Sequence, residues 1–268
     1  MDLIDERPFA VSYSPLSLES RVAVVVGGTS GIGRAMALGL AEAGADVVAT
    51  ARGAANLDAT AAEIETLGRR TLRVASDVTD RASLEVLRDA VIHGLGRVDI
   101  LVNCAGRTQR TPTLDVTDDE WNRIFETNLT GTLRACQVFG SAMLERGYGR
   151  IINIASLGSF VGLFEVAAYA ASKAGVAALT RQLAIEWGAR GVCVNAIMPG
   201  VFRTALNAEL LDGTGRGREF LLRTPMKRFG RLEELAGAAV FLASESASFV
   251  NGEILVVDGG FLASGVNQ

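Results

Sequence analysis

The sequence is poor in the residues that build metal centres and disulfide frameworks. Its 268 residues include one histidine, His93, and three cysteines that stand far apart, at positions 104, 136 and 193. A zinc site needs three or four clustered Cys, His or carboxylate ligands, and a disulfide framework needs an even, patterned set of cysteines. We therefore expect no metal site and no disulfides, which makes the cytoplasm the expected compartment.

Basic clusters and long apolar runs are scarce as well. The 26 Lys and Arg residues are outnumbered by 30 Asp and Glu, which gives a formal net charge of −4. A nucleic-acid-binding domain carries a basic surface, and a membrane-spanning helix needs about 18 apolar residues in a row. The first six residues carry acids where a secretory signal carries basic residues. The composition thus argues against nucleic-acid partners, membrane insertion and secretion.

Short runs rich in Val and Ile alternate with longer segments of helical periodicity. The strand candidates cover residues 22–26, 46–50, 71–75, 98–102, 150–154, 192–197 and 253–257. Several are apolar at nearly every position, which is typical of parallel strands covered by helices on both faces. This alternation predicts an α/β fold with a parallel sheet, in a single domain over residues 18–268. Residues 1–17 precede the first strand and are interpreted as an extension.

A glycine-rich turn directly follows the first strand and opens the first helix. Such a turn lets the backbone bend sharply and approach a pyrophosphate, and the helix N-terminus offers free N–H groups to that anion. Glycine-rich turns also serve as tight connections, and the spacing here differs by one residue from the dinucleotide fingerprint. Its place in the first βα unit favours a doubly wound, Rossmann-type sheet over an eightfold βα barrel. We expect the cofactor to contact Gly27, Thr29, Ser30, Gly31, Ile32 and Gly33.

The end of the second strand bears on the choice of cofactor. An acid there would accept hydrogen bonds from the ribose 2′-hydroxyl of NAD, but this strand ends Thr50-Ala51-Arg52. An arginine can hold the 2′-phosphate of NADP with two parallel hydrogen bonds. We therefore favour NADP(H) and keep NAD(H) open, because Arg52 could also be a solvated surface residue.

A tyrosine and a lysine share one face of a predicted helix. Tyr169 and Lys173 are four residues apart, and a neighbouring ammonium lowers the pKa of a phenol enough to let it transfer protons near neutral pH. Ser156 ends a strand thirteen residues earlier, at the edge of the sheet where ligands bind in this fold class. Its hydroxyl could orient a substrate oxygen.

Taken together, these motifs resemble the classical short-chain dehydrogenase/reductase superfamily. The resemblance runs from about residue 18 to the end and rests on Gly27-x-x-x-Gly31-x-Gly33, Asn103-Cys-Ala-Gly106, Asn128, Ser156, Tyr169-x-x-x-Lys173 and Pro199-Gly200. It implies an oxidoreductase that passes a hydride between a nicotinamide cofactor and an alcohol or ketone carbon. It also implies a homotetramer.

The resemblance assigns a role to each matching residue. Tyr169 would be the general acid or base, Lys173 would tune it and bind the nicotinamide ribose, Ser156 would bind the reacting oxygen, and Asn128 would hold a water of the proton relay. The remaining cofactor contacts would be Asp77 and Val78 at the adenine, Asn103, Ala105 and Gly106 along the middle, and Pro199, Gly200 and Thr204 near the carboxamide.

Residues 201–231 correspond to the family's mobile substrate lid. This segment holds seven cations against three acids, which favours an anionic small-molecule substrate, although the cations could equally be solvated or lie at subunit contacts. Phe160, Leu163 and Phe164 could form an apolar wall of the substrate site or ordinary packing. The segment Thr204-Ala-Leu-Asn207 is similar to gluconate 5-dehydrogenase and related sugar-acid enzymes. A 3-oxoacyl-[acyl-carrier-protein] reductase and a catalytically silent dinucleotide-binding regulator are the alternatives.

Overall fold

The computed structural model describes residues 15–205 and 207–266. Most of the expected N-terminal extension therefore lies outside the described residues. The strands are β1 (Val22–Val26), β2 (Asp46–Thr50), β3 (Ile100–Asn103), β4 (Gly149–Ile154), β5 (Val192–Pro199) and β6 (Ile254–Val257). The helices are α1 (Gly31–Glu42), α2 (Ala54–Thr66), α3 (Arg81–Leu95), α4 (Asp118–Phe125), α5 (Gly131–Arg146), α6 (Ala167–Trp187), α7 (Ala208–Leu211), α8 (Gly215–Arg223) and α9 (Glu233–Ala243). A π-helical turn, Glu126–Thr130, joins α4 to α5, and short 3-10 turns occupy Thr113–Asp115, Leu157–Ser159, Gly188–Arg190 and Glu245–Ala247.

The described strands form one parallel sheet in the order β2-β1-β3-β4-β5-β6. The chain runs outward from β1 to β2 and then returns to the other side of β1 as β3. This reversal is the topological switch point at which doubly wound folds bind their ligands, beyond the carboxyl ends of the strands. The predicted α/β, Rossmann-type class is confirmed.

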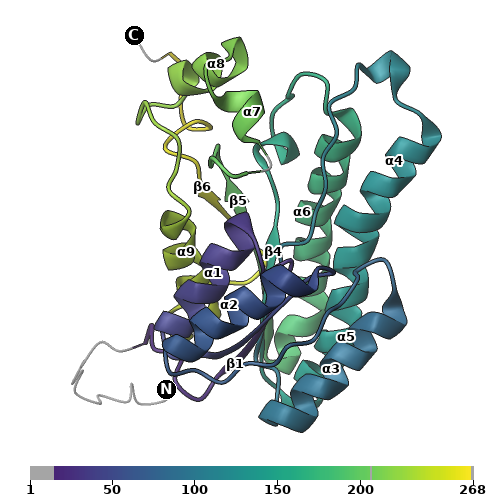
Figure 1. Cartoon of the computed structure of the whole chain (residues 1–268), viewed down its shortest axis with the longest axis vertical. Coiled ribbons are helices and arrows are strands. Elements are labelled where there is room, and N and C mark those ends of the chain that lie inside the picture. Colours follow the sequence, from purple (N-terminus) through teal and green to yellow (C-terminus); the bar gives the residue numbers. More distant parts are fainter. Residues whose placement is uncertain (1–14, 206, 267–268) are drawn as a thin grey trace, which may run out of the picture.

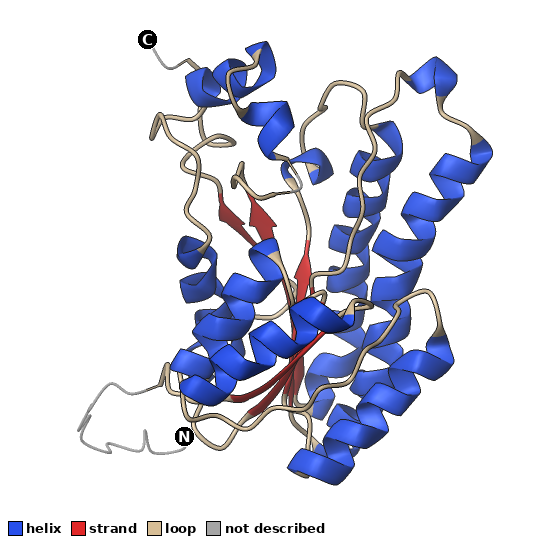
Figure 2. Cartoon of the chain, viewed as in Figure 1, coloured by secondary structure: helices blue, strands red, loops and turns tan. Residues whose placement is uncertain are grey.

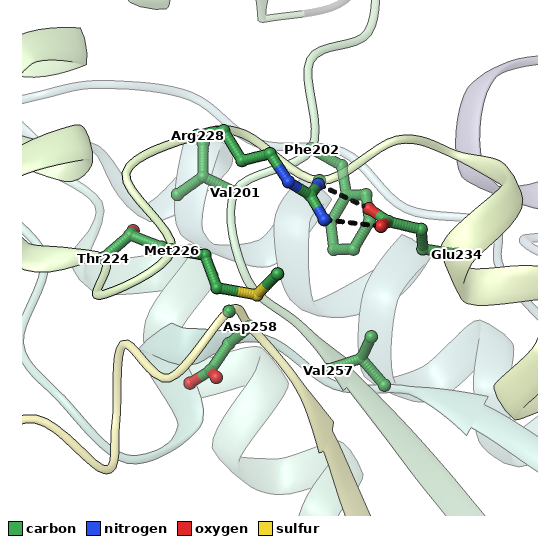
Figure 3. A pocket seen from close by; sticks show the side chains of 10 residues that line it. Val201, Phe202, Thr224, Met226, Arg228, Glu234, Val257 and Asp258 are labelled. Carbon is green, nitrogen blue, oxygen red and sulfur yellow. Dashed lines mark hydrogen bonds and ion pairs between the residues drawn. The ribbon is translucent and has the colours of Figure 1, made fainter.

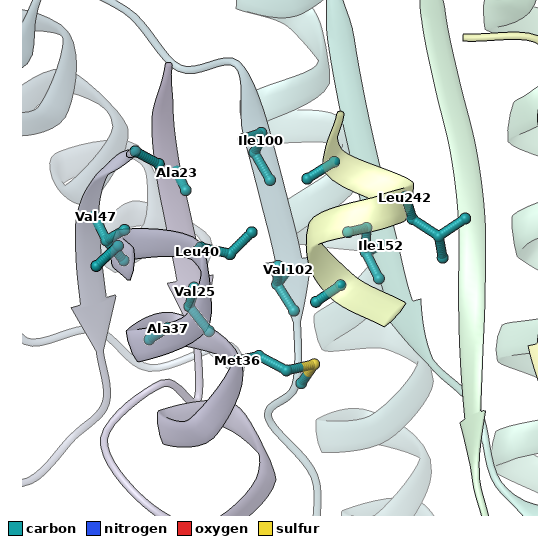
Figure 4. Packing of buried hydrophobic residues seen from close by; sticks show 14 of the residues in the cluster. Ala23, Val25, Met36, Ala37, Leu40, Val47, Ile100, Val102, Ile152 and Leu242 are labelled. Carbon is teal, nitrogen blue, oxygen red and sulfur yellow. The ribbon is translucent and has the colours of Figure 1, made fainter. Parts of the chain in front are cut away.

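Helices cover both faces of the sheet, which explains why the strands are apolar at nearly every position (Figure 2). In β1, Ala23 and Val25 join a cluster with residues of α1 and α9, whereas Val22, Val24 and Val26 join a cluster with α3, α5 and α6. Successive side chains of a strand point to opposite faces, so each face of β1 needs its own apolar set. Figure 4 shows Met36 and Leu40 of α1 and Leu242 of α9 over the first face.

One expected strand, residues 71–75, is wrong. The segment runs beside β2 but bonds to it only near its ends, where Val47 N–H donates to the Arg70 carbonyl and Ser76 N–H donates to the Ala51 carbonyl. The Val74 carbonyl accepts from the Thr50 hydroxyl at 2.6 Å. The Thr50 side chain thus occupies a carbonyl that would otherwise accept a backbone N–H. Residues 71–75 therefore form no hydrogen-bonded ladder with β2.

The lid segment lies beyond the carboxyl ends of the last two strands. Figure 1 shows α7 and α8 stacked past the ends of β5 and β6, on the side of the molecule where α6 begins. The two ends of the segment meet at its base, where Gly230 N–H donates to the Val201 carbonyl at 2.9 Å. Among the described residues, no helix is long and apolar enough to cross a membrane.

Candidate active site

The backbone of the glycine turn after β1 is packed so tightly against neighbouring backbone that it leaves no room for side chains. Gly27 has φ +81°, and a Cβ on it would lie 2.6 Å from the Ala105 nitrogen. A Cβ on Gly33 would lie 2.1 Å from the Gly27 carbonyl oxygen. Both distances are below van der Waals contact, so the turn requires glycine at these positions.

The helix that follows the turn presents free amides to the same edge. Its N-cap, Ser30, is in extended conformation, and its side chain caps no N–H group within the described structure. Uncapped N–H groups at a helix N-terminus form an anion site. The lid comes to this point as well, because the Thr204 methyl lies 3.5 Å from the position of a Cβ on Gly31. The expected cofactor residues Gly27, Ser30, Gly31 and Thr204 are therefore brought together, and their cradle fits a dinucleotide pyrophosphate.

The expected adenosine end lies beside β2. Arg52 is 80% exposed in its side chain, and its Nη1 is 4.0 Å from Asp77 Oδ2. Partial burial raises the pKa of Asp77, but hydrogen bonds from Thr79 and the charge of Arg52 outweigh it and hold that pKa below its ordinary value. The next helix, α2, starts after Gly53 with no acid in its first turn. This corner thus has an exposed guanidinium and a second helix N-terminus without a negative charge.

The expected catalytic side chains come from three different elements and meet at the carboxyl edge. Tyr169 and Lys173 lie one turn apart on α6, Ser156 follows β4, and Asn128 lies in the π-helical turn. Ser156 is close enough to Tyr169 to lower the pKa of its phenol. A Cβ on Gly106 would lie 3.4 Å from Asn128 Oδ1 and 3.7 Å from Lys173 Nζ. Asn128 and Lys173 therefore meet at Gly106, with Tyr169 one turn from Lys173 on α6.

Lys173 is buried with its ammonium on a backbone oxygen. Its Nζ donates to the Ile154 carbonyl at 2.7 Å, and the residue is 5% exposed. Burial lowers the pKa of Lys173 to about 8, against a smaller opposing effect of Cys104. Lys173 is therefore mostly protonated at pH 7, in spite of its burial.

Burial also shifts the pKa of the Tyr169 phenol, in the direction opposite to the one expected from the sequence. It raises the pKa of Tyr169, a hydrogen bond with Ser156 lowers it, and the neighbouring Cys104 raises it further. In the protein alone the pKa of Tyr169 is therefore raised, and the lowering expected from Lys173 stays a prediction. The Lys173 ammonium is held by the Ile154 carbonyl, and desolvation of the phenolate dominates.

Asn128 ties the helix of the tyrosine to the loop after β3. Its Oδ1 accepts from Arg107 N–H at 2.8 Å, and its Nδ2 donates to the Arg107 carbonyl and to Ser172 Oγ, both at 3.0 Å. Ser172 in turn donates to the Tyr169 carbonyl at 2.7 Å. All these donors and acceptors are buried or half-buried, so the side-chain amide of Asn128 has a single orientation.

Most of the lid cations are already paired. Arg203 makes a two-pronged ion pair with Asp212, with Nε to Oδ1 at 2.8 Å. Glu234 at the start of α9 binds both Arg228 and Arg231. The count over residues 201–231 leaves out Glu234. The net positive charge expected for the lid is thus partly a result of where that segment ends.

A charged cluster on the rim of the site was missed in the sequence. Arg110 Nε donates to Glu165 Oε2 at 2.5 Å, and Arg216 of α8 donates to the Phe164 carbonyl at 3.1 Å. These residues come from the loop after β3, the loop before α6 and the lid. The only available signal was the position of Arg110, four residues after the Asn103-x-Ala-Gly106 motif. Phe160 and Phe164 are 55% and 72% exposed on the same loop, so they are not core packing.

A cavity of about 150 Å³ lies at the base of the lid. It is lined by residues that follow β5, by the segment returning from α8 and by the end of β6: Val201, Phe202, Thr224, Met226, Arg228, Gly230, Glu234, Val257, Asp258 and Gly259. Figure 3 shows Met226 and Phe202 facing its interior, with the Arg228–Glu234 ion pair along one side. None of the expected catalytic residues line it, so it is separate from the edge where Tyr169 lies.

Comparison with known proteins agrees with this geometry. A family model described as enoyl-(acyl carrier protein) reductase matches residues 26–262. A D-threitol dehydrogenase of Mycolicibacterium smegmatis is 42% identical over 91% of this chain and 94% of its own. A 2-dehydro-3-deoxy-D-gluconate 5-dehydrogenase of Bacillus subtilis is 40% identical over 94% and 98%.

Solved structures give the same result. A gluconate 5-dehydrogenase from Burkholderia cenocepacia, in complex with NADP and tartrate, superimposes with a TM-score of 0.90, 36% identity, and coverage of 94% of this chain and 99% of that one. Sequence, fold and the intact Ser156, Tyr169 and Lys173 set therefore agree. The chain belongs to the short-chain dehydrogenase/reductase family of nicotinamide-dependent oxidoreductases.

Proposed function

We propose that this oxidoreductase acts on a small polyhydroxylated carboxylate or its keto form, with gluconate and 5-ketogluconate as the named pair. The observation that carries the reaction type is the meeting of Ser156, Tyr169 and Lys173 beside the glycine turn. The names of the sugar-acid relatives support the substrate class. A rim that contains two guanidinium groups and one carboxylate supports an anion.

The side chains of this site divide the work of moving one proton. The bound nicotinamide cofactor supplies or accepts the hydride. Ser156 Oγ holds the reacting oxygen, and Tyr169 donates a proton to that oxygen in reduction or takes it in oxidation. Because Ser156 is close enough to Tyr169 to lower the pKa of its phenol, both hydroxyls would bind the same carbinol oxygen.

Lys173 and Asn128 keep that proton transfer in place. The Lys173 ammonium is positioned by the Ile154 carbonyl, and its remaining donors would hold the ribose of the nicotinamide cofactor. Asn128 fixes the π-helical turn against the Arg107 backbone, and the water of the proton relay would bind at this turn. π-Helical turns are frequent at functional sites for such reasons.

NADP(H) is the proposed cofactor. Gly27, Thr29, Ser30, Gly31, Ile32 and Gly33 would hold the pyrophosphate, Asp77 and Val78 the adenine, Asn103, Ala105 and Gly106 the middle, and Pro199, Gly200 and Thr204 the carboxamide. The exposed guanidinium of Arg52 and the uncapped start of α2 favour a 2′-phosphate. The related gluconate 5-dehydrogenase carries NADP.

A neutral polyol is the second candidate substrate, because the D-threitol dehydrogenase is 42% identical to this chain. A panel of aldonates, the matching alditols and a 3-oxoacyl thioester, each assayed with both cofactors, separates the candidates. The proposal expects the highest kcat/KM with an aldonate and NADP⁺. A higher kcat/KM with an alditol favours the polyol, and preference for the thioester favours the carrier-protein reductase suggested by the family model.

A further inference from the structure

One lid cation differs from the other six. Arg216 is half-buried, whereas Arg203, Arg218, Arg223, Lys227, Arg228 and Arg231 are all exposed. Four of those six are within 4.0 Å of a carboxylate of the lid or of α9. No carboxylate of the described residues lies within that distance of Arg216. A partly desolvated guanidinium without a counter-ion is costly, so its position needs an explanation.

The guanidinium of Arg216 bridges the lid and the loop before α6. Its Nη1 donates to the Phe164 carbonyl at 3.1 Å, and its Cζ lies 5.6 Å from the ring centre of Phe220 on its own helix. An arginine has five N–H donors, so this one backbone bond leaves most of its donors available. Phe164 stands five residues before Tyr169 in the loop that leads into α6, so the guanidinium contacts the loop that precedes the catalytic helix.

The charge of a second guanidinium, that of Arg110, acts on Arg216. Burial lowers the pKa of Arg216, and the charge of Arg110 lowers it further, while Glu165 and Glu219 act in the opposite direction. Arg110 is bound by Glu165, and Glu219 is shared with Arg223 at 3.9 Å. Counting Arg110, Arg216 and Glu165 gives a net charge of +1, and adding the Glu219–Arg223 pair leaves that sum unchanged. The cluster lacks one negative charge.

The backbone at the centre of this cluster is strained. Glu165 has φ +62°, a conformation that non-glycine residues rarely adopt. Thr111 N–H holds it by donating to the Glu165 carbonyl at 2.9 Å. Such strain costs about 1–3 kcal/mol and persists where the surrounding structure enforces it, commonly at ligand-binding positions. The strained loop fixes the carboxylate of Glu165 against Arg110 and leaves Arg216 unneutralised.

We propose that Arg216 is a specificity-determining residue of the lid, whose guanidinium binds the carboxylate of the substrate and supplies the one charge match that the Arg110–Glu165–Arg216 cluster lacks. This inference rests on the proposed sugar-acid function and identifies the lid residue that binds the carboxylate of the acid. The substrate carboxylate then bridges the lid to the rim, because Arg216 keeps its bond to the Phe164 carbonyl. Arg203 and Arg228, which have carboxylate partners of their own, do not take part.

The test compares an acid with a neutral substrate of the same carbon chain, D-gluconate and D-glucitol, with NADP⁺. Arg216→Gln removes the charge and keeps hydrogen-bonding capacity, and Arg216→Lys keeps the charge but loses the fork geometry. Arg218→Gln is the matched control, because it removes an exposed charge two residues away on the same helix. We expect Arg216→Gln to lower kcat/KM for gluconate about 10- to 100-fold, mainly through KM. For glucitol the change should stay within about twofold.

The outcomes separate this inference from the proposed function. If Arg216→Lys recovers part of the gluconate KM lost in Arg216→Gln, and Arg218→Gln behaves like wild type, the charge of Arg216 binds the substrate carboxylate. If wild type prefers gluconate and Arg216→Gln keeps that preference, or loses both substrates equally, the inference is wrong while the sugar-acid function stands. If wild type itself shows no preference for gluconate over glucitol, the proposed function fails first, and the inference fails with it.

Discussion

Substitution of Gly33 by alanine tests the architecture of the cofactor turn. A Cβ at this position would lie 2.1 Å from the Gly27 carbonyl oxygen, 2.9 Å from the Gly27 carbonyl carbon and 3.2 Å from Cys104 Sγ. The first two contacts are with backbone, so no side-chain rotation relieves them. To make room, α1 must move away from the end of β1, or the turn must open.

Both responses should be measurable. Forcing an extra carbon into a close-packed site costs about 1–3 kcal/mol, which for a protein of this size lowers Tm by roughly 2–12 °C. Opening the turn also displaces the N–H groups at the start of α1. We expect the Kd for NADPH, measured by quenching of protein fluorescence, to rise about 10- to 100-fold, because shifts near 1 Å have effects of that order at binding sites.

Gly237 provides the matched control. It lies on the exposed side of α9, and a Cβ there would have no heavy atom within 4 Å. Gly237→Ala should therefore raise stability by about 0.5–1 kcal/mol through helix propensity and leave the NADPH Kd unchanged. A Gly33→Ala protein that binds NADPH as tightly as wild type would refute the reasoning, since the turn could then not be in contact with the pyrophosphate.

Four further predictions follow from the same geometry. Tyr169→Phe should lower turnover by at least about 100-fold and leave NADPH affinity nearly unchanged, since only the proton-transfer group is lost; steady-state kinetics and fluorescence titration check this. Arg52→Ala should weaken NADP(H) binding about tenfold with little change for NAD(H), and a higher wild-type kcat/KM with NAD(H) would contradict the assignment. For Lys173→Met, the pKa lowered from 10.5 to about 8 means that the unfolded chain binds the proton more tightly. Wild-type stability relative to this variant should therefore rise between pH 8 and pH 10.5, by up to about 3 kcal/mol, and parallel denaturation curves across that range would exclude it. Finally, we predict a homotetramer, and a monomeric mass by light scattering at micromolar concentration would be evidence against it.

The fold was accessible from the sequence because its strands are buried on both faces. In β1 every residue is apolar and buried, which is the pattern typical of a strand covered by helices on both faces. Residues 71–75 have a similar run of β-formers, but Arg73 and Ala75 are exposed. The Thr50 hydroxyl, which binds the Val74 carbonyl, is a single side-chain contact that no periodicity reports.

The charges of the lid could not be interpreted from the sequence of the lid alone. Glu234 lies three residues beyond the counted segment and pairs with two of its arginines, so the net charge of residues 201–231 overstated the field. The pair that matters on the rim, Arg110 and Glu165, is separated by 55 positions. Only the folded chain brings these groups together.

The pKa of Tyr169 shows the same limit for chemistry. Spacing on a helix correctly placed Lys173 one turn from Tyr169, but the direction of the shift depends on how much water the phenol loses, which spacing does not contain. Burial raises the pKa of Tyr169 by more than Ser156 lowers it, so in the protein alone that pKa lies above its ordinary value.

The parallel sheet explains why residues spread from position 27 to position 204 form one site. Every strand of the described sheet runs in the same direction, so each connection that leaves a carboxyl end starts at the same edge. Gly27 leaves β1, Gly106 follows β3, Ser156 follows β4 and Thr204 follows β5. The reversal of strand order at β1 places the turn of Gly27 against Ala105, whose nitrogen would lie 2.6 Å from a Cβ on Gly27. This contact brings the expected cofactor residues after β1 next to the loop after β3. A substitution that changes the packing between β1 and β3 should therefore disturb cofactor binding and proton transfer together, although it touches neither group directly.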